Sequence, residues 1–263
     1  MDIIFMGAGN LATHLSQALQ QAGHRVLQVF SRTKESASAL AGVLNSPFTT
    51  DVAEVLPEAE VYFFCVSDAV LQDLASRLYA HLRKVALVGS PSKGAGALFL
   101  HTAGSMPIDV LPTLRRGVFY PMQTFSKSRP VDFQQIPIFL ESQTDMRMME
   151  LLARAFSQHV YRLDGEKRRY LHLSAVFACN FVNHMYDLSA RILESHDIPF
   201  SVMFPLVDET ASKVHSLPPH EAQTGPAVRY DQNVMERHLD LLADDPQMQE
   251  IYKLLSRSIH DKL

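Results

Sequence analysis

A short glycine-containing turn near the N-terminus constrains the possible folds of this chain more than any other feature. Residues 7–12 read Gly-Ala-Gly-Asn-Leu-Ala, directly after an apolar run at residues 3–6 and directly before an amphipathic stretch. This matches the pattern G-x-G-x-x-G/A, in which the glycines allow a tight turn and a close backbone approach to a pyrophosphate. The pattern predicts a dinucleotide site, with a purely structural turn as the alternative. The residues expected to contact the dinucleotide here are Gly7, Gly9, Asn10 and Leu11.

The first 164 residues alternate short apolar runs with amphipathic stretches. Such alternation predicts βαβ units, a parallel sheet and right-handed crossovers. We expect strands at residues 3–6, 25–30, 61–66, 97–101, 117–125, 136–141 and 160–163, with a further apolar run at 85–88. The helices expected between them cover residues 11–22, 34–44, 68–79 and 145–158.

The pattern changes after Gly165. Residues 166–196 contain no glycine or proline and are rich in apolar side chains, which predicts one long helix. Further helices are expected at residues 200–214, 226–243 and 246–262, with a loop at 215–225. The sequence therefore predicts two domains: an α/β domain of the Rossmann type at residues 1–164 and an all-α domain at residues 165–263.

The end of the second expected strand indicates which dinucleotide binds. An NAD site usually places Asp or Glu here to bind the ribose 2′-hydroxyl. This sequence instead continues Ser31-Arg32-Thr33, and the first carboxylate, Glu35, lies inside the next expected helix. Hydroxyl groups and an arginine suit a 2′-phosphate. We therefore expect NADP rather than NAD, with Ser31, Arg32 and Thr33 as contacts; an exposed turn without a ligand is the alternative.

The third long strand is followed by Ser67 and Asp68. In open α/β sheets, ligands bind outside the carboxyl ends of the strands. Val66 and Ser67 are therefore expected to contact the nicotinamide half of the cofactor. Asp68 could do the same, or cap the helix that follows.

Composition argues against several classes of function. A net charge of −4 over 263 residues argues against non-specific binding to nucleic acid and offers no basic face to a membrane. No apolar run reaches the roughly 18 residues of a transmembrane span. Cys65 and Cys179 lie in apolar runs, as expected for reduced cysteines of a cytoplasmic protein, and the glycine turn begins too early to leave room for a signal peptide. The twelve histidines show no metal-ligand spacing, so no metal is expected.

Four separated segments resemble one protein family. They are HTAGS (101–105), GVFYPMQTFS (117–126), EKRRYLHLSAVFACNFVNH (166–184) and QTGPAVRYDQ (223–232). Over essentially its whole length the chain resembles Rossmann-like proteins with a C-terminal DUF2520 domain. Its two-domain plan is similar to pyrroline-5-carboxylate reductase, ketopantoate reductase and 6-phosphogluconate dehydrogenase. The resemblance implies an NADP-binding domain followed by a helical domain that contacts the substrate and forms a homodimer.

The chain departs from this superfamily in one respect. Its hydroxyacid dehydrogenases carry a catalytic lysine with an asparagine four residues later on the long helix. In this chain Lys167 is followed at that spacing by Leu171. The lysine–asparagine pair is therefore not carried over to this sequence.

The long expected helix has a polar stripe at helical spacing, and its other sides are largely apolar. A helix of this kind is expected to be buried, so its amides and imidazole need partners, such as a ligand in a cleft between the domains. The solvent-facing side of the helix is the alternative interpretation. His172, Asn180 and Asn183 are the catalytic candidates and Arg169 is a substrate contact. The whole stripe is Arg169, His172, Val176, Asn180, Asn183 and Asp187.

Two further segments offer polar groups to a substrate. His101 ends an apolar strand and is a candidate proton donor, with a structural histidine as the alternative. Ser105 lies in the turn that follows this strand, and Gln123 lies in a segment that could close over the same cleft. Thr224-Gly225-Pro226 reads as a helix start whose N–H groups, together with Arg229, could bind a carboxylate, although plain capping explains it equally well.

Together these features favour a cytoplasmic NADP-dependent reductase that acts on a small carbonyl or imine substrate bound between the two domains. A non-catalytic NADP-sensing protein is the alternative from another class. A third possibility is an NADP reductase that uses a deazaflavin as its hydride partner.

Overall fold

The computed structural model describes residues 1–87 and 93–261 and divides into two compact units. The first unit is Met1–Cys179 and the second is Asn180–Leu263. The division lies inside a π-helical segment, Val176–Phe181. The domain boundary predicted after residue 164 lies before this division, at the start of helix α5 (Gly165–Ala175), and the roles predicted for the two domains remain predictions.

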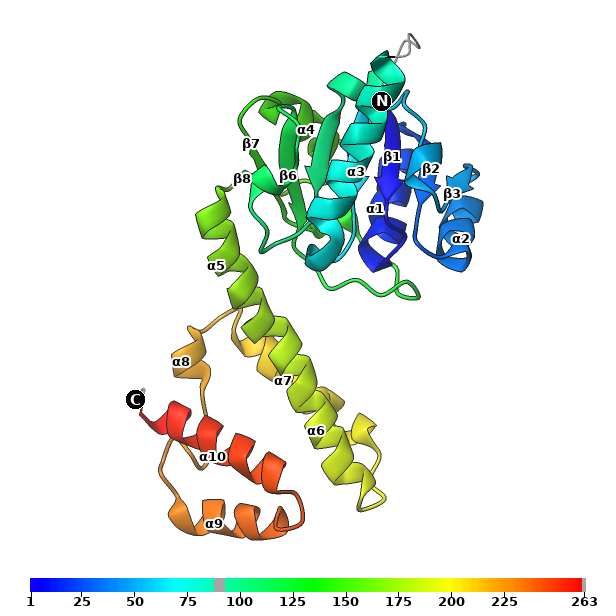
Figure 1. Cartoon of the computed structure of the whole chain (residues 1–263). Helices are drawn as coiled ribbons and strands as arrows, with labels where there is room; N and C mark the ends of the chain where they lie inside the picture. Colours follow the sequence, from blue (N-terminus) through cyan, green and yellow to red (C-terminus); the bar gives the residue numbers. More distant parts are fainter. Residues whose placement is uncertain (88–92, 262–263) are drawn as a thin grey trace. The chain divides into compact units, whose positions relative to one another are not determined.

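One mixed sheet forms the centre of the first unit (Figure 1). Among the described residues it has eight strands in the order β3-β2-β1-β4-β5-β6-β7-β8. Their bounds are β1 Asp2–Met6, β2 Arg25–Phe30, β3 Phe48–Thr49, β4 Val61–Phe64, β5 Leu98–His101, β6 Arg116–Pro121, β7 Ile138–Ser142 and β8 Val160–Arg162. The helices of this unit are α1 Asn10–Gln21, α2 Lys34–Leu44, α3 Asp68–Leu87, α4 Met146–Arg154 and α5.

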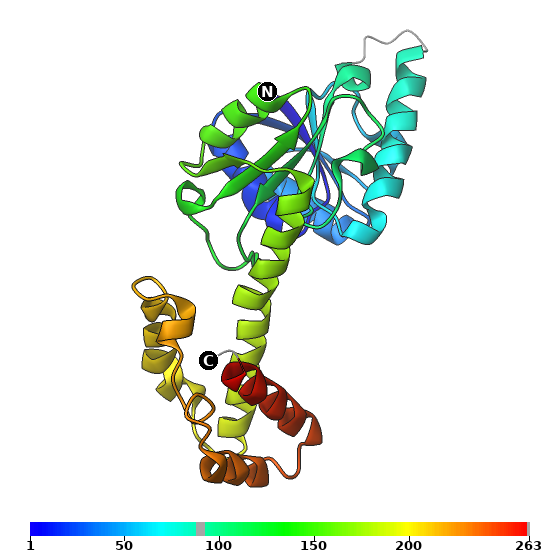
Figure 2. The ribbon, with the colours of Figure 1, turned by 90° about the vertical axis from the view of Figure 1, so that its left-hand side faces the viewer.

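The residues of β1 show why this sheet is covered on both faces. Ile3 and Phe5 belong to one hydrophobic cluster, together with buried residues of α1, α2 and α4. Ile4 and Met6 belong to a second cluster, together with buried residues of α3. Successive side chains of a strand point to opposite faces, so the two clusters lie on opposite sides of the sheet. Figure 2 shows α3, in cyan, along one side.

The predicted parallel sheet is confirmed from β3 to β6 and is wrong at β7. Strand β7 pairs with β6 antiparallel, from Gly117 opposite Ser142 to Pro121 opposite Ile138. Parallel neighbours need a long crossover, usually a helix. The connection from β6 to β7 contains only a 3₁₀ turn, Phe133–Gln135, so the chain returns beside β6 in the opposite direction.

Three strand predictions also need correction. The apolar residues 85–87 continue α3 and form no strand, and Val88 lies outside the described residues. Strand β4 ends at Phe64, before Cys65 and Val66. Strand β6 ends at Pro121 because the chain then leaves the sheet in the connection to β7.

The predicted long helix is present, but its apolar sides are not buried in the single chain. It runs as α5, the π-helical segment and α6 (Val182–Glu194). Leu173 is 53% exposed and Phe177 is 62% exposed. The sequence pattern predicted burial because it cannot indicate whether the same chain or another one covers an apolar face.

The second unit is helical. After α6 it contains a 3₁₀ turn at Phe200–Met203 and the helices α7 Phe204–Lys213, α8 Pro219–Ala222, α9 Gln232–Leu241 and α10 Pro246–His260. The helix predicted from residue 226 is wrong at its start. Asp231 caps α9 by accepting a hydrogen bond from the N–H of Val234. Tyr230 has φ +51°, which is outside the right-handed helical region, so residues 226–230 form a turn that is not continuous with α9.

Arg168 is a buried charge that fastens α5 to the sheet. Its side chain is 1% exposed. Nη1 donates to the carbonyl oxygens of Ala103, Gly104 and Met106 at 2.9–3.0 Å, and Nη2 donates to a carboxylate oxygen of Glu141 at 2.8 Å. The guanidinium therefore joins α5 to the turn after β5 and to β7.

His101, at the end of β5, is fully buried, which corrects its predicted role as a proton donor. Its Nδ1 accepts a hydrogen bond from the N–H of Ala103 at 3.2 Å. Burial, reinforced by the positive charge of Arg168, lowers the pKa of His101 to about 3. A buried imidazole that stays neutral at physiological pH has a structural role here.

Replacing Arg168 by methionine should lower the free energy of unfolding by about 3–5 kcal/mol, as when one partner of a buried ion pair is removed. Three carbonyl groups would lose their donor and Glu141 its counter-ion. Arg169→Met is the matched control because Arg169 is adjacent and exposed, and it should change stability by less than about 0.5 kcal/mol. Urea denaturation at one protein concentration measures both. Equal losses in the two variants would contradict the anchoring role.

His101 should destabilise the folded protein in mild acid. Because its pKa is lowered from 6.5 to about 3 on folding, the unfolded chain binds the proton first, and stability is lost as the pH falls from 6.5 towards 3. At pH 5 this side chain accounts for a loss of about 2 kcal/mol. His101→Asn, whose amide oxygen can still accept from Ala103, should flatten the pH dependence of unfolding between pH 7 and pH 5. An unchanged slope would refute the lowered pKa.

Candidate functional site

A cavity of about 460 Å³ lies at the carboxyl edge of the sheet, around the ends of β1, β2 and β4. The turn between β1 and α1, the turn between β2 and α2, and the first turns of α3 form its walls. Residues 7–10, 30–32 and 65–67 line it, together with Ser36, Val70, Asp73, Leu74, Arg77 and Lys127. The structure therefore brings together most of the residues that the sequence predicts to contact a dinucleotide.

The two glycines of the N-terminal turn have different physical roles. Gly7 has φ +124°, and a Cβ there would overlap the carbonyl group of Cys65 after β4. Gly9 is the opposite case: a Cβ there would meet no described atom within 4 Å. The first glycine therefore lets the turn pack against the neighbouring strand, and the second leaves space above the start of α1, as a pyrophosphate requires.

The first turn of α1 is suited to an anion. Its N-cap residue is Gly9, which has no side chain to accept hydrogen bonds from the first N–H groups, and no acidic residue lies in that turn. Unpaired N–H groups and the helix dipole favour a negative charge at this end. A pyrophosphate thus fits both the space and the donors at this place.

The end of β2 offers positive charge and hydroxyl groups. Ser31 and Arg32 line the cavity, as the sequence predicts. Arg77 and Lys127 line it too and were not predicted. Arg77 lies on α3 and forms an ion pair with Asp73 at 3.6 Å. Because the two residues are four positions apart on a helix, the sequence alone indicates only an ordinary surface ion pair. Lys127 follows β6 in a connection whose path depends on the antiparallel β7.

Two predicted cofactor contacts do not line this cavity. Leu11 packs against the hydrophobic cluster beneath α1. Thr33 is the N-cap residue of α2. Asn10 does line the cavity, and its side-chain amide donates to the carbonyl of Phe125 at 2.8 Å, which fastens the loop after β6 over the start of α1.

Cys65 contributes to the cavity as a neutral thiol. Burial raises the pKa of Cys65 to about 12. Only the thiolate is a strong nucleophile, so this residue is not a candidate for covalent catalysis.

Beyond the cavity, polar groups meet at the ends of β5 and β6. Oη of Tyr120 lies 3.1 Å from Nδ1 of His172, on α5. Burial raises the pKa of Tyr120 above its ordinary value, and the charge of Arg168 opposes this shift. Ser105 donates a hydrogen bond to Asp68, the first residue of α3, so the turn after β5 is tied to the same helix that lines the cavity.

The other predicted substrate and catalytic residues are solvent-exposed. Arg169 is exposed, because its neighbour Arg168 is the residue that points into the protein. Gln123 is exposed, and its side chain accepts from the N–H of Thr124. Thr224 caps no helix, since α9 starts at Gln232. Four of the predicted residues are exposed and belong to the second unit: Asn180, Asn183, Thr224 and Arg229.

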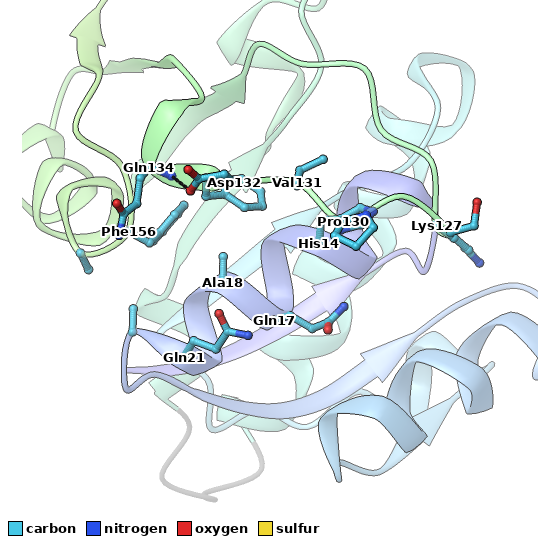
Figure 3. Close-up of a pocket in the computed structure, with 14 residues that line it drawn as sticks. His14, Gln17, Ala18, Gln21, Lys127, Pro130, Val131, Asp132, Gln134 and Phe156 are labelled. Atoms are coloured by element: carbon cyan, nitrogen blue, oxygen red, sulfur yellow. Dashed lines mark hydrogen bonds between the residues drawn. The ribbon is translucent and has the colours of Figure 1, made fainter. Parts of the chain in front are cut away.

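A second cavity, of about 510 Å³, lies between α1 and the loop that leads into β7 (Figure 3). Gln17, Gln21 and His14 line it from α1, and Asp132 and Gln134 line it from the loop. Asp132 accepts a hydrogen bond from the N–H of Gln134, so its carboxylate is used within the loop. None of the predicted site residues lies in this cavity.

Two absences concern the part of the chain that the structure describes. No cluster of three or more His, Cys, Asp or Glu side chains there could hold a metal ion. No helix among those residues is long and apolar enough to cross a membrane.

Comparisons with known protein families divide the chain in two. Residues 2–93 match the family model described as "NADP oxidoreductase coenzyme F420-dependent". Residues 136–259 match the "Domain of unknown function (DUF2520)". No curated protein matches the chain.

Solved structures resemble the chain over its whole length. The "putative NADP oxidoreductase BF3122" from Bacteroides fragilis is 50% identical, with a TM-score of 0.90, and the match covers 99% of this chain and 98% of that one. Protein TM1727 from Thermotoga maritima is 23% identical, with a TM-score of 0.74 and coverage of 98% and 99%.

A structure of the imine reductase from Myxococcus stipitatus with NADP⁺ is 13% identical, with a TM-score of 0.69 and coverage of 99% and 93%. At such identities the Thermotoga and Myxococcus structures show a shared fold only. The Bacteroides match has 50% identity over nearly all of both chains, and it therefore shows a shared family as well as a shared fold. The chain belongs to the same family as that protein, in which a Rossmann domain of the NADP oxidoreductase type precedes a DUF2520 domain.

Proposed function

We propose that this protein is an NADP-dependent reductase that transfers a hydride from NADPH to a small carbonyl or imine substrate. The observation that carries the proposal is the cavity at the carboxyl edge of the sheet. It combines the open space above Gly9 with the cations Arg32, Arg77 and Lys127. The description of the 50% identical relative as an NADP oxidoreductase supports the same reading.

Each part of the cavity has a role in holding the cofactor. The N-terminal turn of α1 would bind the pyrophosphate, and Ser31 with Arg32 would bind the 2′-phosphate. Val66 and Ser67 would lie along the nicotinamide half, towards the ends of β4 and β5. Bound NADPH supplies a hydride, and the side chains of the chain orient the substrate and provide a proton.

Two alternative functions are each supported by a specific observation. A protein that binds NADP without turnover is favoured by the absence of the lysine–asparagine pair: Lys167 is 74% exposed and is paired with Asp164. A deazaflavin as hydride partner is favoured by the family description, which names coenzyme F420. Oxidation of NADPH in the presence of a carbonyl, an imine or a deazaflavin distinguishes all three.

Arg32→Ala should weaken the binding of NADPH by at least about tenfold, since the 2′-phosphate loses a charge-assisted hydrogen bond. NADH, which lacks that phosphate, should lose less than about threefold. Arg154→Ala is the matched control, because Arg154 is exposed at the end of α4 and away from the cavity. Titration by nucleotide fluorescence measures the six dissociation constants of the wild type and the two variants for NADPH and NADH. If Arg32→Ala weakens the binding of NADPH and NADH equally, Arg32 does not bind the 2′-phosphate.

We also propose that the protein is a homodimer formed through its helical unit. Large apolar side chains there are exposed in the single chain: Val202 is 56% exposed, Phe204 54% and Leu206 58%. Soluble monomers rarely expose several such side chains together.

Leu206→Glu should therefore halve the molar mass measured by light scattering after gel filtration, because a carboxylate cannot be buried without a partner. Leu114→Glu is the control: Leu114 is 89% exposed in the first unit, and this variant should keep the wild-type mass. A wild-type protein that has the mass of one chain would disprove the dimer.

A further inference from the structure

A tyrosine–histidine pair at the ends of β6 and α5 has no role in the proposed binding of NADPH. Oη of Tyr120 and Nδ1 of His172 are 3.1 Å apart, and the two rings meet nearly edge to face at 6.0 Å between centroids. Both side chains are only partly buried. This arrangement can hold and move a proton.

The position of His172 is fixed by close packing. A Cβ at Gly104 would lie 2.5 Å from Nδ1 of His172 and 2.7 Å from its Cγ, so only glycine leaves room for the ring. Arg168 precedes His172 by one turn of α5 and binds the carbonyl oxygens of the same turn. The backbone after β5 is thus held between two side chains of one helix face.

The charge nearest the pair is that of Arg168. Burial raises the pKa of Tyr120, and the positive charge of Arg168 opposes this rise. The same charge, after burial, lowers the pKa of His101. The acidic groups nearby are already engaged: Glu141 on β7 binds Arg168, and Asp68 on α3 accepts from Ser105. A cationic iminium is therefore disfavoured here, and a developing oxyanion is stabilised.

We propose that Tyr120 is the catalytic acid for the reduction of a neutral ketone or aldehyde, that His172 replaces its proton, and that Arg168 is a positioning residue for both. This inference rests on the proposed function and selects its carbonyl branch over its imine branch.

The reaction balances without a further reactant. A hydride from NADPH forms a C–H bond at the carbonyl carbon, the C=O π electrons move to oxygen, and NADPH is oxidised to NADP⁺. The O–H bond of Tyr120 breaks as its proton moves to that oxygen, giving an alcohol. The phenolate takes a proton from protonated His172 at Nδ1, and water restores the proton of His172. The sum is one carbonyl, one NADPH and one proton converted to one alcohol and NADP⁺.

The experiment follows NADPH oxidation at 340 nm by the full-length protein with two neutral carbonyl probes, 2,3-butanedione and ethyl pyruvate, and one imine probe, 2-methyl-1-pyrroline. NADPH affinity is titrated separately for every variant. The wild type should reduce a carbonyl probe faster than the imine. Tyr120→Phe should lower kcat for the carbonyl at least about 100-fold, the usual contribution of a general acid, with NADPH affinity within about twofold.

Tyr161→Phe is the matched control. Tyr161 stacks on Phe139 from β8, and Tyr120 contacts the same phenylalanine ring from β6. Removing the hydroxyl of Tyr161 should leave kcat unchanged.

His172→Asn provides a readout that loss of structure would not imitate. Its amide can still hydrogen-bond to Tyr120 but cannot carry a proton. The rate of His172→Asn should be lower than that of the wild type, and added imidazole, which can carry the missing proton, should restore part of it. Thermal unfolding of each variant shows that it is folded.

Three outcomes overturn the assignment: Tyr120→Phe as active as the wild type, the imine reduced in preference to both carbonyls, or bound NADPH with reduction of none of the probes. A protein that fails to bind NADPH is a different result, because it removes the proposed function itself.

Discussion

The buried guanidinium of Arg168 is the interaction on which the reactive end of the first unit depends. Through its two Nη atoms it satisfies three carbonyl groups of one turn and a carboxylate of β7, which offsets part of the cost of burying its charge. The turn that it holds contains Gly104, against which His172 packs, and Ser105, which is bonded to the start of α3. The positions of β5, β7, α3 and α5 at this edge are thus linked through one side chain.

Glycines, which have no side chain, are as important at this sheet edge as the residues that carry functional groups. Gly7 lets the N-terminal turn approach the end of β4, and Gly104 lets the ring of His172 approach the turn after β5. Gly9 instead keeps a space open. The same sheet edge therefore offers room for an anion at β1 and close packing for His172 of α5 beside β6. Gly7 and Gly104 each remove a Cβ from a crowded position, and Gly9 leaves open space.

Local sequence patterns predict the elements nearest the glycine turn well. The strand at residues 25–30 and the helix at residues 34–44 were predicted with their observed bounds, because periodicity and capping decide them locally. Position in space was harder to predict. The choice of Arg168 over Arg169 as the inward residue depends on the rotation of α5 about its axis, which spacing alone does not fix. Arg77 and Lys127 reach the cavity through tertiary packing, and the reversed β7 depends on a connection that lacks a helix.

The departure from the lysine–asparagine plan has a chemical consequence. In this chain the long helix has a cationic side chain, Arg168, and an imidazole, His172, at the same spacing of four residues. Arg168 is 1% exposed and its two Nη atoms are bonded to carbonyl oxygens and Glu141, so its guanidinium is not available to a substrate. His172 contacts the proposed acid directly, with Nδ1 at 3.1 Å from Oη of Tyr120. Helix α5 thus supplies the buried support of Arg168 and the proposed proton relay His172, and the proposed acid Tyr120 is on the sheet, in β6.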